Sequence, residues 1–111
     1  MMEFSTEKSG AFLVLAAKGR MDTLTAPSFE AECVKWLDQG EKRLVVDLSA
    51  LDYISSAGLR SILSAAKKCK AQGGDIAFCA LAGIVAEVFS VSGFAALLPV
   101  FETREQALAR A

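Results

Sequence analysis

Short apolar runs alternate with amphipathic segments along the whole chain, and this alternation predicts an α/β fold. The segments expected as strands are residues 4–6, 12–17, 44–48, 76–81 and 97–101. The segments expected as helices are residues 25–39, 56–72, a short stretch around 84–89, and a last one after Thr103. This order predicts a single domain over residues 1–111, with an N-terminal antiparallel hairpin, a mixed sheet of four to five strands and about four helices.

The two long helices have the clearest pattern. Residues 25–39 begin with Thr25 as the expected N-cap, and Pro27 lies in the first turn, where a missing N–H is tolerated. Apolar residues at helical spacing give this helix one buried face, formed by Phe29, Cys33, Trp36 and Leu37. The stripe expected to be buried in residues 56–72 consists of Leu59, Ile62, Leu63, Ala66 and Cys69. Both helices are expected on one face of the sheet.

The boundaries of the strands follow from polar residues. The run 44–48 is almost entirely apolar, which is typical of a central strand covered on both faces. We expect residues 18–20 to end the second strand and residues 49–55 to form a loop before the second long helix. Pro99 predicts that the last strand lies at an edge of the sheet.

Composition places the chain among folded proteins and removes several functions. The 111 residues are 53% hydrophobic and 23% charged, with a net charge of −1, which excludes a disordered chain and gives no basic surplus for nucleic acid. Residues 1–10 do not resemble a signal peptide, and no apolar run is long enough to span a bilayer. We therefore expect a cytoplasmic protein without membrane insertion.

The sequence offers little for catalysis. It contains no His, and the three Cys lie in apolar runs, where we expect buried thiols in a reducing compartment. Asp47, inside an apolar strand, and Asp52 are interpreted as hydrogen-bonded structural residues. We expect no catalytic residue, no metal and no cofactor. An enzyme that uses one of the thiols is the weakest interpretation, because an apolar run does not stabilise a thiolate.

One segment, residues 53–59, follows a buried strand and opens an amphipathic helix. Ser55 or Ser56 can act as its N-cap, which requires no function. The same position is favourable for a negative group, because free N–H groups and the positive end of the helix dipole face it. From the residues alone, a plain cap and a phosphorylatable serine both remain open.

Residues 48–59, LSALDYISSAGL, resemble the signature of STAS domains, specifically the bacterial anti-sigma factor antagonists, in which the motif runs Asp-Ser-Ser/Thr-Gly-Leu. Three other segments agree with the family in place and order. They are residues 19–27, the turn at 73–75, and residues 88–94 with Phe101 and residues 106–108 beyond. The resemblance covers essentially the whole chain. It departs from the family motif at Ser55, where the family has Asp, and at Ala57, where it has Ser or Thr.

The resemblance implies a protein-binding switch without catalysis of its own. Ser56 would be phosphorylated by an anti-sigma factor that is itself a Ser kinase, and a phosphatase would reset the cycle. Arg60 would pair with the phosphate or face solvent. The residues that this resemblance assigns to partner binding are Asp22, Thr23, Thr25, Ser55, Ser56, Ala57, Gly58 and Arg60. A monomer or weak dimer is expected. The alternative is an unphosphorylated STAS accessory subunit, for example of a lipid-transporting ABC system.

Overall fold

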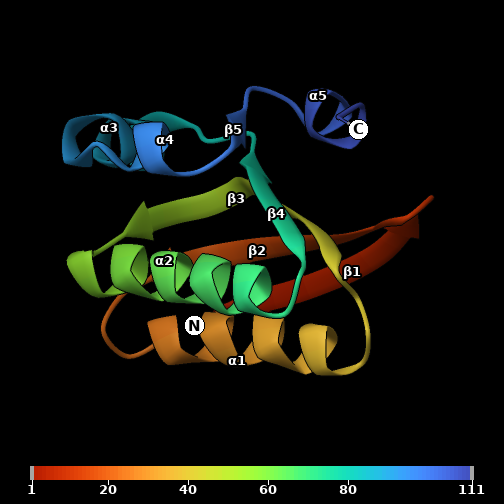
Figure 1. The fold of residues 1–111 in the computed structure, drawn as a ribbon. Coiled ribbons are helices and arrows are strands. Elements are labelled where there is room, and N and C mark those ends of the chain that lie inside the picture. Colours follow the sequence, from red (N-terminus) through yellow and green to blue (C-terminus); the bar gives the residue numbers. More distant parts are fainter. Residues whose placement is uncertain (1, 111) are drawn as a thin grey trace.

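The structure is a computed structural model that describes residues 2–110 (Figure 1). A five-stranded mixed sheet has the order β1-β2-β3-β4-β5. Its strands are β1 (Glu3–Ser9), β2 (Phe12–Met21), β3 (Arg43–Ile54), β4 (Asp75–Cys79) and β5 (Val100–Phe101). β1 is antiparallel to β2, and all the later pairs are parallel. The α/β class, the mixed five-stranded sheet and the opening hairpin are therefore confirmed, and β5 lies at an edge as Pro99 predicted.

The helices within residues 2–110 are α1 (Ala26–Asp38), α2 (Ser56–Ala71), α3 (Gly83–Ser92), α4 (Phe94–Leu97) and α5 (Arg104–Leu108). Figure 1 shows α1, α2 and the α3–α4 pair following one another from the bottom to the top of the view. α1 and α2 pack against each other, and α3 packs against β3. The expectation that the two long helices share one face is confirmed.

Core side chains point alternately to the two faces of the sheet, as the strand period of two requires. On β2, Leu13 and Leu15 belong to the large cluster beneath α1, α2 and α3, whereas Phe12 and Val14 belong to a small cluster on the other face. Ala107 of α5 closes this small cluster. The chain therefore forms one main hydrophobic layer and a second, thinner one under its C-terminal helix.

Two strand boundaries predicted above are wrong, and they share a cause. β2 continues through residues 18–20 to Met21, and β3 continues through the expected loop at 49–55 as far as Ile54. These extensions pair with each other, from Lys18 opposite Ala50 to Met21 opposite Ile54, with register shifts on either side of Gly19. Backbone pairing stabilises this part of the sheet, and hydrophobic periodicity does not report such pairing.

The C-terminal boundaries also differ from those expected. β4 ends at Cys79 and not at residue 81. The last strand covers only Val100–Phe101 where residues 97–101 were expected, because Leu97 ends the short helix α4. The hydroxyl of Thr103 accepts a hydrogen bond from the N–H of Gln106 at 3.1 Å, which confirms the predicted start of the last helix.

The buried side of α2 is rotated slightly from the predicted stripe. Leu59, Ile62 and Cys69 are buried as expected. Leu63 and Ala66 are only half-buried, and Ser61 and Ala65 take the buried positions on the side of α1. The hydroxyl of Ser61 donates to the carbonyl oxygen of Ala26 at 2.7 Å, so a polar residue is tolerated where the two helices touch.

Candidate functional site

The candidate site lies where β2 and β3 end. Because the two strands are parallel neighbours, their carboxyl ends meet at the same edge of the sheet, and the segments that follow them are adjacent. Met21 pairs with Ile54, and the N–H of Ser55 donates to the carbonyl oxygen of Met21 at 2.9 Å. The loop at residues 22–25 and the first turn of α2 are therefore held together by backbone contacts.

At the start of α2, the two serines have different environments. Ser55 is the N-cap, and its hydroxyl accepts a hydrogen bond from the N–H of Gly58 at 3.2 Å. Ser56 is the first helical residue and is exposed, and its hydroxyl makes no hydrogen bond with any of residues 2–110. The open question about the cap is thus answered in favour of Ser55, and Ser56 has a free hydroxyl.

Gly58 is required by close packing beneath this turn. A Cβ atom at this position would lie 2.7 Å from Cγ1 of Ile54 and 2.9 Å from the carbonyl oxygen of Met21. No side chain fits in this space without movement of the backbone of β2. The glycine therefore allows the first turn of α2 to rest directly on the ends of the two strands.

The loop that precedes α1 is organised by Asp22. Its Oδ1 accepts from the N–H groups of Leu24 at 3.0 Å and Thr25 at 3.1 Å. These bonds, led by the backbone N–H of Thr25, hold the pKa of the Asp22 carboxyl below its usual range. Thr25 precedes α1 as expected, but its hydroxyl makes no capping bond and donates instead to the carbonyl oxygen of Arg20 at 2.6 Å. The start of α1 therefore has no side-chain cap, and Asp22 organises the turn before the helix.

Two grooves flank the start of α2. One, of about 310 Å³, lies between α1 and α2, and Thr23, Ala57 and Arg60 contribute to it. The other, of about 390 Å³, lies between α2 and α3 and includes Ser56. The structure thus brings the predicted partner-binding residues to one end of the molecule and places Ser56 on the side of α3.

The sequence analysis missed the α3 wall of this second groove. Ile84 is 48% exposed and Val91 is 87% exposed, whereas Val85 and Phe89 of the same helix are buried. The signal was present in the sequence, because Ile84 and Val91 are seven residues apart and so lie on one helix face, distinct from the buried one.

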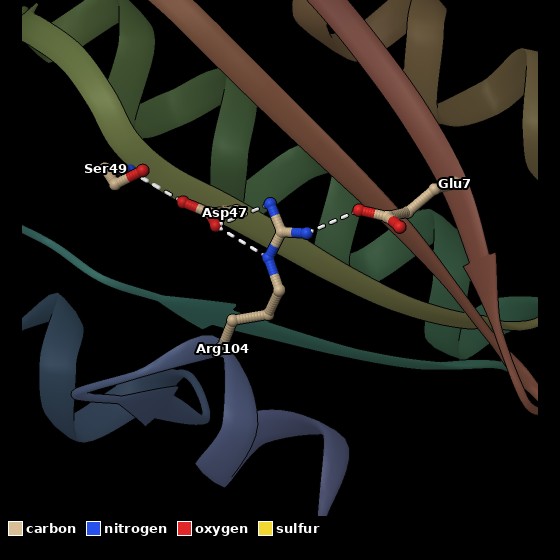
Figure 2. A network of polar contacts seen from close by, with 4 residues as sticks. All are labelled: Glu7, Asp47, Ser49 and Arg104. Atoms are coloured by element: carbon tan, nitrogen blue, oxygen red, sulfur yellow. Dashed lines mark hydrogen bonds and ion pairs between the residues drawn. The ribbon is translucent and has the colours of Figure 1, made fainter.

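Asp47 lies outside this site, and its role is structural (Figure 2). Nε of Arg104, on α5, donates to Oδ2 of Asp47 at 2.9 Å, and the same guanidinium donates to Glu7 of β1. Oδ1 of Asp47 accepts from the N–H of Ser49 at 2.9 Å. Burial opposes ionisation, yet the bonds from Ser49 and Arg104 hold the pKa of Asp47 below its usual range. The structural interpretation of Asp47 is correct. That of Asp52 is wrong, because Asp52 is exposed and its carboxylate forms no hydrogen bond or ion pair with any of residues 2–110.

The three cysteines are free and buried. Burial raises the pKa of Cys33 to about 12 and that of Cys79 to about 11, and it also raises the pKa of Cys69. Such thiols are protonated at neutral pH and are poor nucleophiles. Among residues 2–110, no three His, Cys, Asp or Glu side chains gather as metal ligands would, and no helix is both long and apolar enough to cross a bilayer.

Comparison with known proteins gives consistent matches over nearly the whole chain. The model of the STAS domain family matches residues 3–107. A candidate anti-sigma factor antagonist of Bordetella bronchiseptica, BtrV, is 41% identical over 108 residues, which are 97% of this chain and 93% of that protein.

Solved structures agree in fold. An anti-sigma factor antagonist from Mycobacterium paratuberculosis superposes with a TM-score of 0.87 at 22% identity, covering 97% of this chain and 92% of that one. The Bacillus cell fate determinant SpoIIAA in its phosphorylated form gives a TM-score of 0.70 at 19% identity, with 96% of both chains covered.

Proposed function

Since this chain belongs to the STAS domain family and is an anti-sigma factor antagonist by homology, we propose that it is switched by phosphorylation of Ser56. Anti-sigma factor antagonists are non-enzymatic regulatory proteins. In the proposed cycle, the unmodified protein binds an anti-sigma factor, which then releases its sigma factor. The anti-sigma factor is also the kinase that modifies Ser56, and a separate phosphatase restores the binding form.

The observation that carries this proposal is that the two serines have different structural roles. Ser55 caps α2, so the exposed hydroxyl of Ser56 has no structural role within residues 2–110. A kinase can therefore reach and modify Ser56 without removing a hydrogen bond that the fold uses. Ser55 also stands where the family has Asp, and Ser and Asp are equally good N-caps. The departure from the family motif thus preserves the cap and removes only a negative charge.

In the proposed transfer, the Ser56 oxygen forms a bond to the γ-phosphorus of ATP, and the bond from that phosphorus to the β–γ bridging oxygen breaks, which releases ADP. The hydroxyl proton passes to a base of the kinase, because the residue before Ser56 is not a carboxylate and the chain has no His. This chain contributes the nucleophile and a rigid helix start that presents it. The phosphatase step hydrolyses the same O–P bond.

The added charge is expected to act on the interface and not on the fold. A phosphate at Ser56 carries a charge of about −1.5 to −2 and lies at the N-terminus of α2, where a negative group is stabilising by about 0.3–1 kcal/mol. Arg60, one turn further along, is on the same side of the helix. Desolvation of the phosphate in a protein interface is costly, so the partner dissociates while the domain stays folded.

Phosphate mapping tests the proposal. The protein is incubated with its cognate anti-sigma factor and ATP, and phosphorylated residues are located by mass spectrometry. We expect one phosphate, on Ser56. The variant Ser56→Ala should bind the anti-sigma factor and stay bound when ATP is added. The matched control is Ser64→Ala, on the same helix, which should be phosphorylated as the wild type is.

Modification of Ser55 or Ser64 in place of Ser56 would overturn the proposal. Absence of any phosphate, with the partner still bound, would favour the alternative of an unphosphorylated STAS accessory subunit. Thermal unfolding of the phosphorylated protein provides a second criterion, because a large drop in melting temperature would mean that the switch acts through the fold.

A further inference from the structure

The two faces of the sheet are covered unequally. α1, α2 and α3 pack on one face and form the large core cluster with it. Figure 1 shows α5 across the sheet from α1 and α2. The small cluster on that second face consists of Phe12, Val14, Val45, Cys79 and Ala107, and all but Ala107 lie on strands. The burial of these strand residues therefore depends on residues 102–110, which we call the α5 strap.

The α5 strap has little apolar contact of its own. Ala107 is its one fully buried residue, and Leu108 is half-buried. By comparison, α1 buries Phe29, Cys33 and Leu37 in the main core. Burial of an alanine methyl group stabilises a fold far less than burial of Leu or Phe, and a helix of five residues is not stable in isolation. Apolar packing alone therefore does not hold the strap in place.

Two arginines anchor the α5 strap to the strands. Figure 2 shows that Arg104 reaches one carboxylate on β3 and another on β1. Nη1 of Arg110 donates to Oδ1 of Asp75 at 2.9 Å, and Nη2 donates to the carbonyl oxygen of Leu44 at 3.2 Å. The Asp75 side chain is 45% exposed, and solvent screening makes ion pairs with such partners weak. The strap is thus held by a few polar contacts over a thin apolar cluster.

The segment before the strap stays attached to the sheet by contacts that the strap does not make. β5 pairs with β4, and the N–H of Ala80 donates to the carbonyl oxygen of Phe101 at 3.2 Å. The first polar contacts of the strap are internal, because the N–H of Glu102 donates to Oε1 of Gln106 and the hydroxyl of Thr103 caps the helix. A rotation at residues 102–103 therefore releases α5 and leaves β5 paired.

We propose that the α5 strap opens as a unit from the folded domain and thereby controls access to the thiol of Cys79. In the closed form Cys79 is fully buried, and burial raises its pKa to about 11. Opening removes this cover and exposes the thiol with Phe12 and Val45, while the helices on the other face stay packed. Cys33 and Cys69 belong to the main cluster, so opening distinguishes Cys79 from them. This proposal does not depend on the function proposed above.

Thiol labelling of the native chain tests the strap. The protein reacts with iodoacetamide at about pH 8 for increasing times, and mass spectrometry of the digested protein quantifies each cysteine separately. We expect Cys79 to be labelled at least about a hundredfold faster than Cys33, because local opening requires less free energy than unfolding of the domain. Cys69 should be labelled as slowly as Cys33. In urea below the unfolding midpoint, labelling of Cys33 should accelerate steeply and that of Cys79 only slightly, since opening of the strap exposes much less surface.

Two variants separate opening of the strap from unfolding of the domain. Arg104→Met should speed labelling of Cys79 about tenfold, because the closed form loses an anchor. The matched control is Lys67→Met, which removes an exposed cation of α2 that forms no ion pair within residues 2–110, and it should have no effect. Ile62→Val, in the main core, should speed labelling of Cys33 by about two- to tenfold and leave Cys79 unchanged, because this side chain stays buried when the strap opens.

Equal labelling rates and equal urea dependence of Cys79 and Cys33 would overturn the proposal, because both thiols would then be exposed only by unfolding of the whole domain. The same conclusion would follow if Ile62→Val sped both thiols equally. An unchanged Cys79 rate in Arg104→Met would remove the arginine anchor from the proposal. Hydrogen exchange gives a readout without thiols. The N–H of Ala80 should stay protected while Cys79 is labelled, and equally fast exchange would show that β5 opens too, which contradicts the proposed boundary of the strap.

Discussion

Replacing Arg104 by methionine removes the polar contact that joins α5 to the sheet (Figure 2). Nε and one terminal nitrogen of Arg104 each lie 2.9 Å from Oδ2 of Asp47. The Asp47 side chain is 7% exposed and that of Arg104 is 32% exposed. Methionine retains an apolar stem of similar length, so the change leaves a nearly buried carboxylate whose remaining hydrogen bond comes from the N–H of Ser49.

Hydrogen bonds to charged groups contribute about 1.5–3 kcal/mol each to stability. The free energy of unfolding should fall by about 1.5 kcal/mol at pH 7, near the lower end of this range. The loss is small because solvent screens the partly exposed guanidinium and because Asp47 keeps its hydrogen bond from Ser49. In urea unfolding this loss moves the midpoint by about 0.5–1.5 M. The matched control is Glu7→Gln, which removes the other carboxylate of the same arginine; that carboxylate is 62% exposed, so the loss should stay below about 0.5 kcal/mol.

The pH dependence of the stability difference provides an independent test of the contact between Arg104 and Asp47. The folded pKa of Asp47 lies below its usual range, so its contribution to stability is present above the unfolded value of about 3.9 and is lost as the pH falls through the folded pKa. Without Arg104, that folded pKa rises. The stability difference between wild type and Arg104→Met should therefore narrow as the pH falls from 7 to about 3.5. A loss below about 0.5 kcal/mol at pH 7, or a difference that does not change with pH, would refute this reasoning.

Three further predictions concern α2 and are checked by urea unfolding. Ile62→Ala should cost about 2–5 kcal/mol because the side chain is fully buried, and the half-buried Leu63 should cost clearly less when replaced by Ala; equal losses would contradict the observed rotation of the helix. Ser55→Ala should lower the free energy of unfolding by about 1 kcal/mol through loss of the cap, whereas Ser55→Asp should leave it nearly unchanged. Ser55→Asp should also speed phosphorylation of Ser56 in the kinase assay. A slower reaction would show that the added carboxylate does not assist the hydroxyl. Gly58→Ala should cost about 1–3 kcal/mol, although Ala favours helices, because the new Cβ meets a strand carbonyl at 2.9 Å; a stabilised variant would show that the strand end yields easily.

The elements of the fold were predictable where local pattern and tertiary environment agree. Phe29, Cys33 and Leu37 share one helix face at a spacing that any helix would impose, and they are buried. Prediction failed where stability comes from pairing between distant segments. Residues 18–20 are charged residues or glycine, and residues 49–54 mix polar and apolar residues without strand alternation, yet the backbones of the two segments pair with each other in the sheet.

The candidate site was also predictable only in part from the sequence. The local sequence indicated a serine cap at the start of a helix, but only the packed structure distinguishes Ser55, which is used by the helix, from Ser56, which is free. Thr25 stands at the predicted N-cap position of α1, but its hydroxyl donates to the carbonyl oxygen of Arg20 and does not cap the helix. This difference depends on how the loop leaves the end of β2, which local sequence does not report.

The sequence by itself determined the order of the elements, the face that α1 buries and the helix start that presents Ser56, because these depend on residues within a few positions of one another. Tertiary structure alone decided that the exposed apolar residues of α3, Ile84 and Val91, face α2 across a groove, and that Arg104 reaches Asp47 from 57 positions away. The physical reason is that periodicity reports which side of an element is apolar, whereas its neighbour is set by the topology of the sheet and the packing of the whole chain.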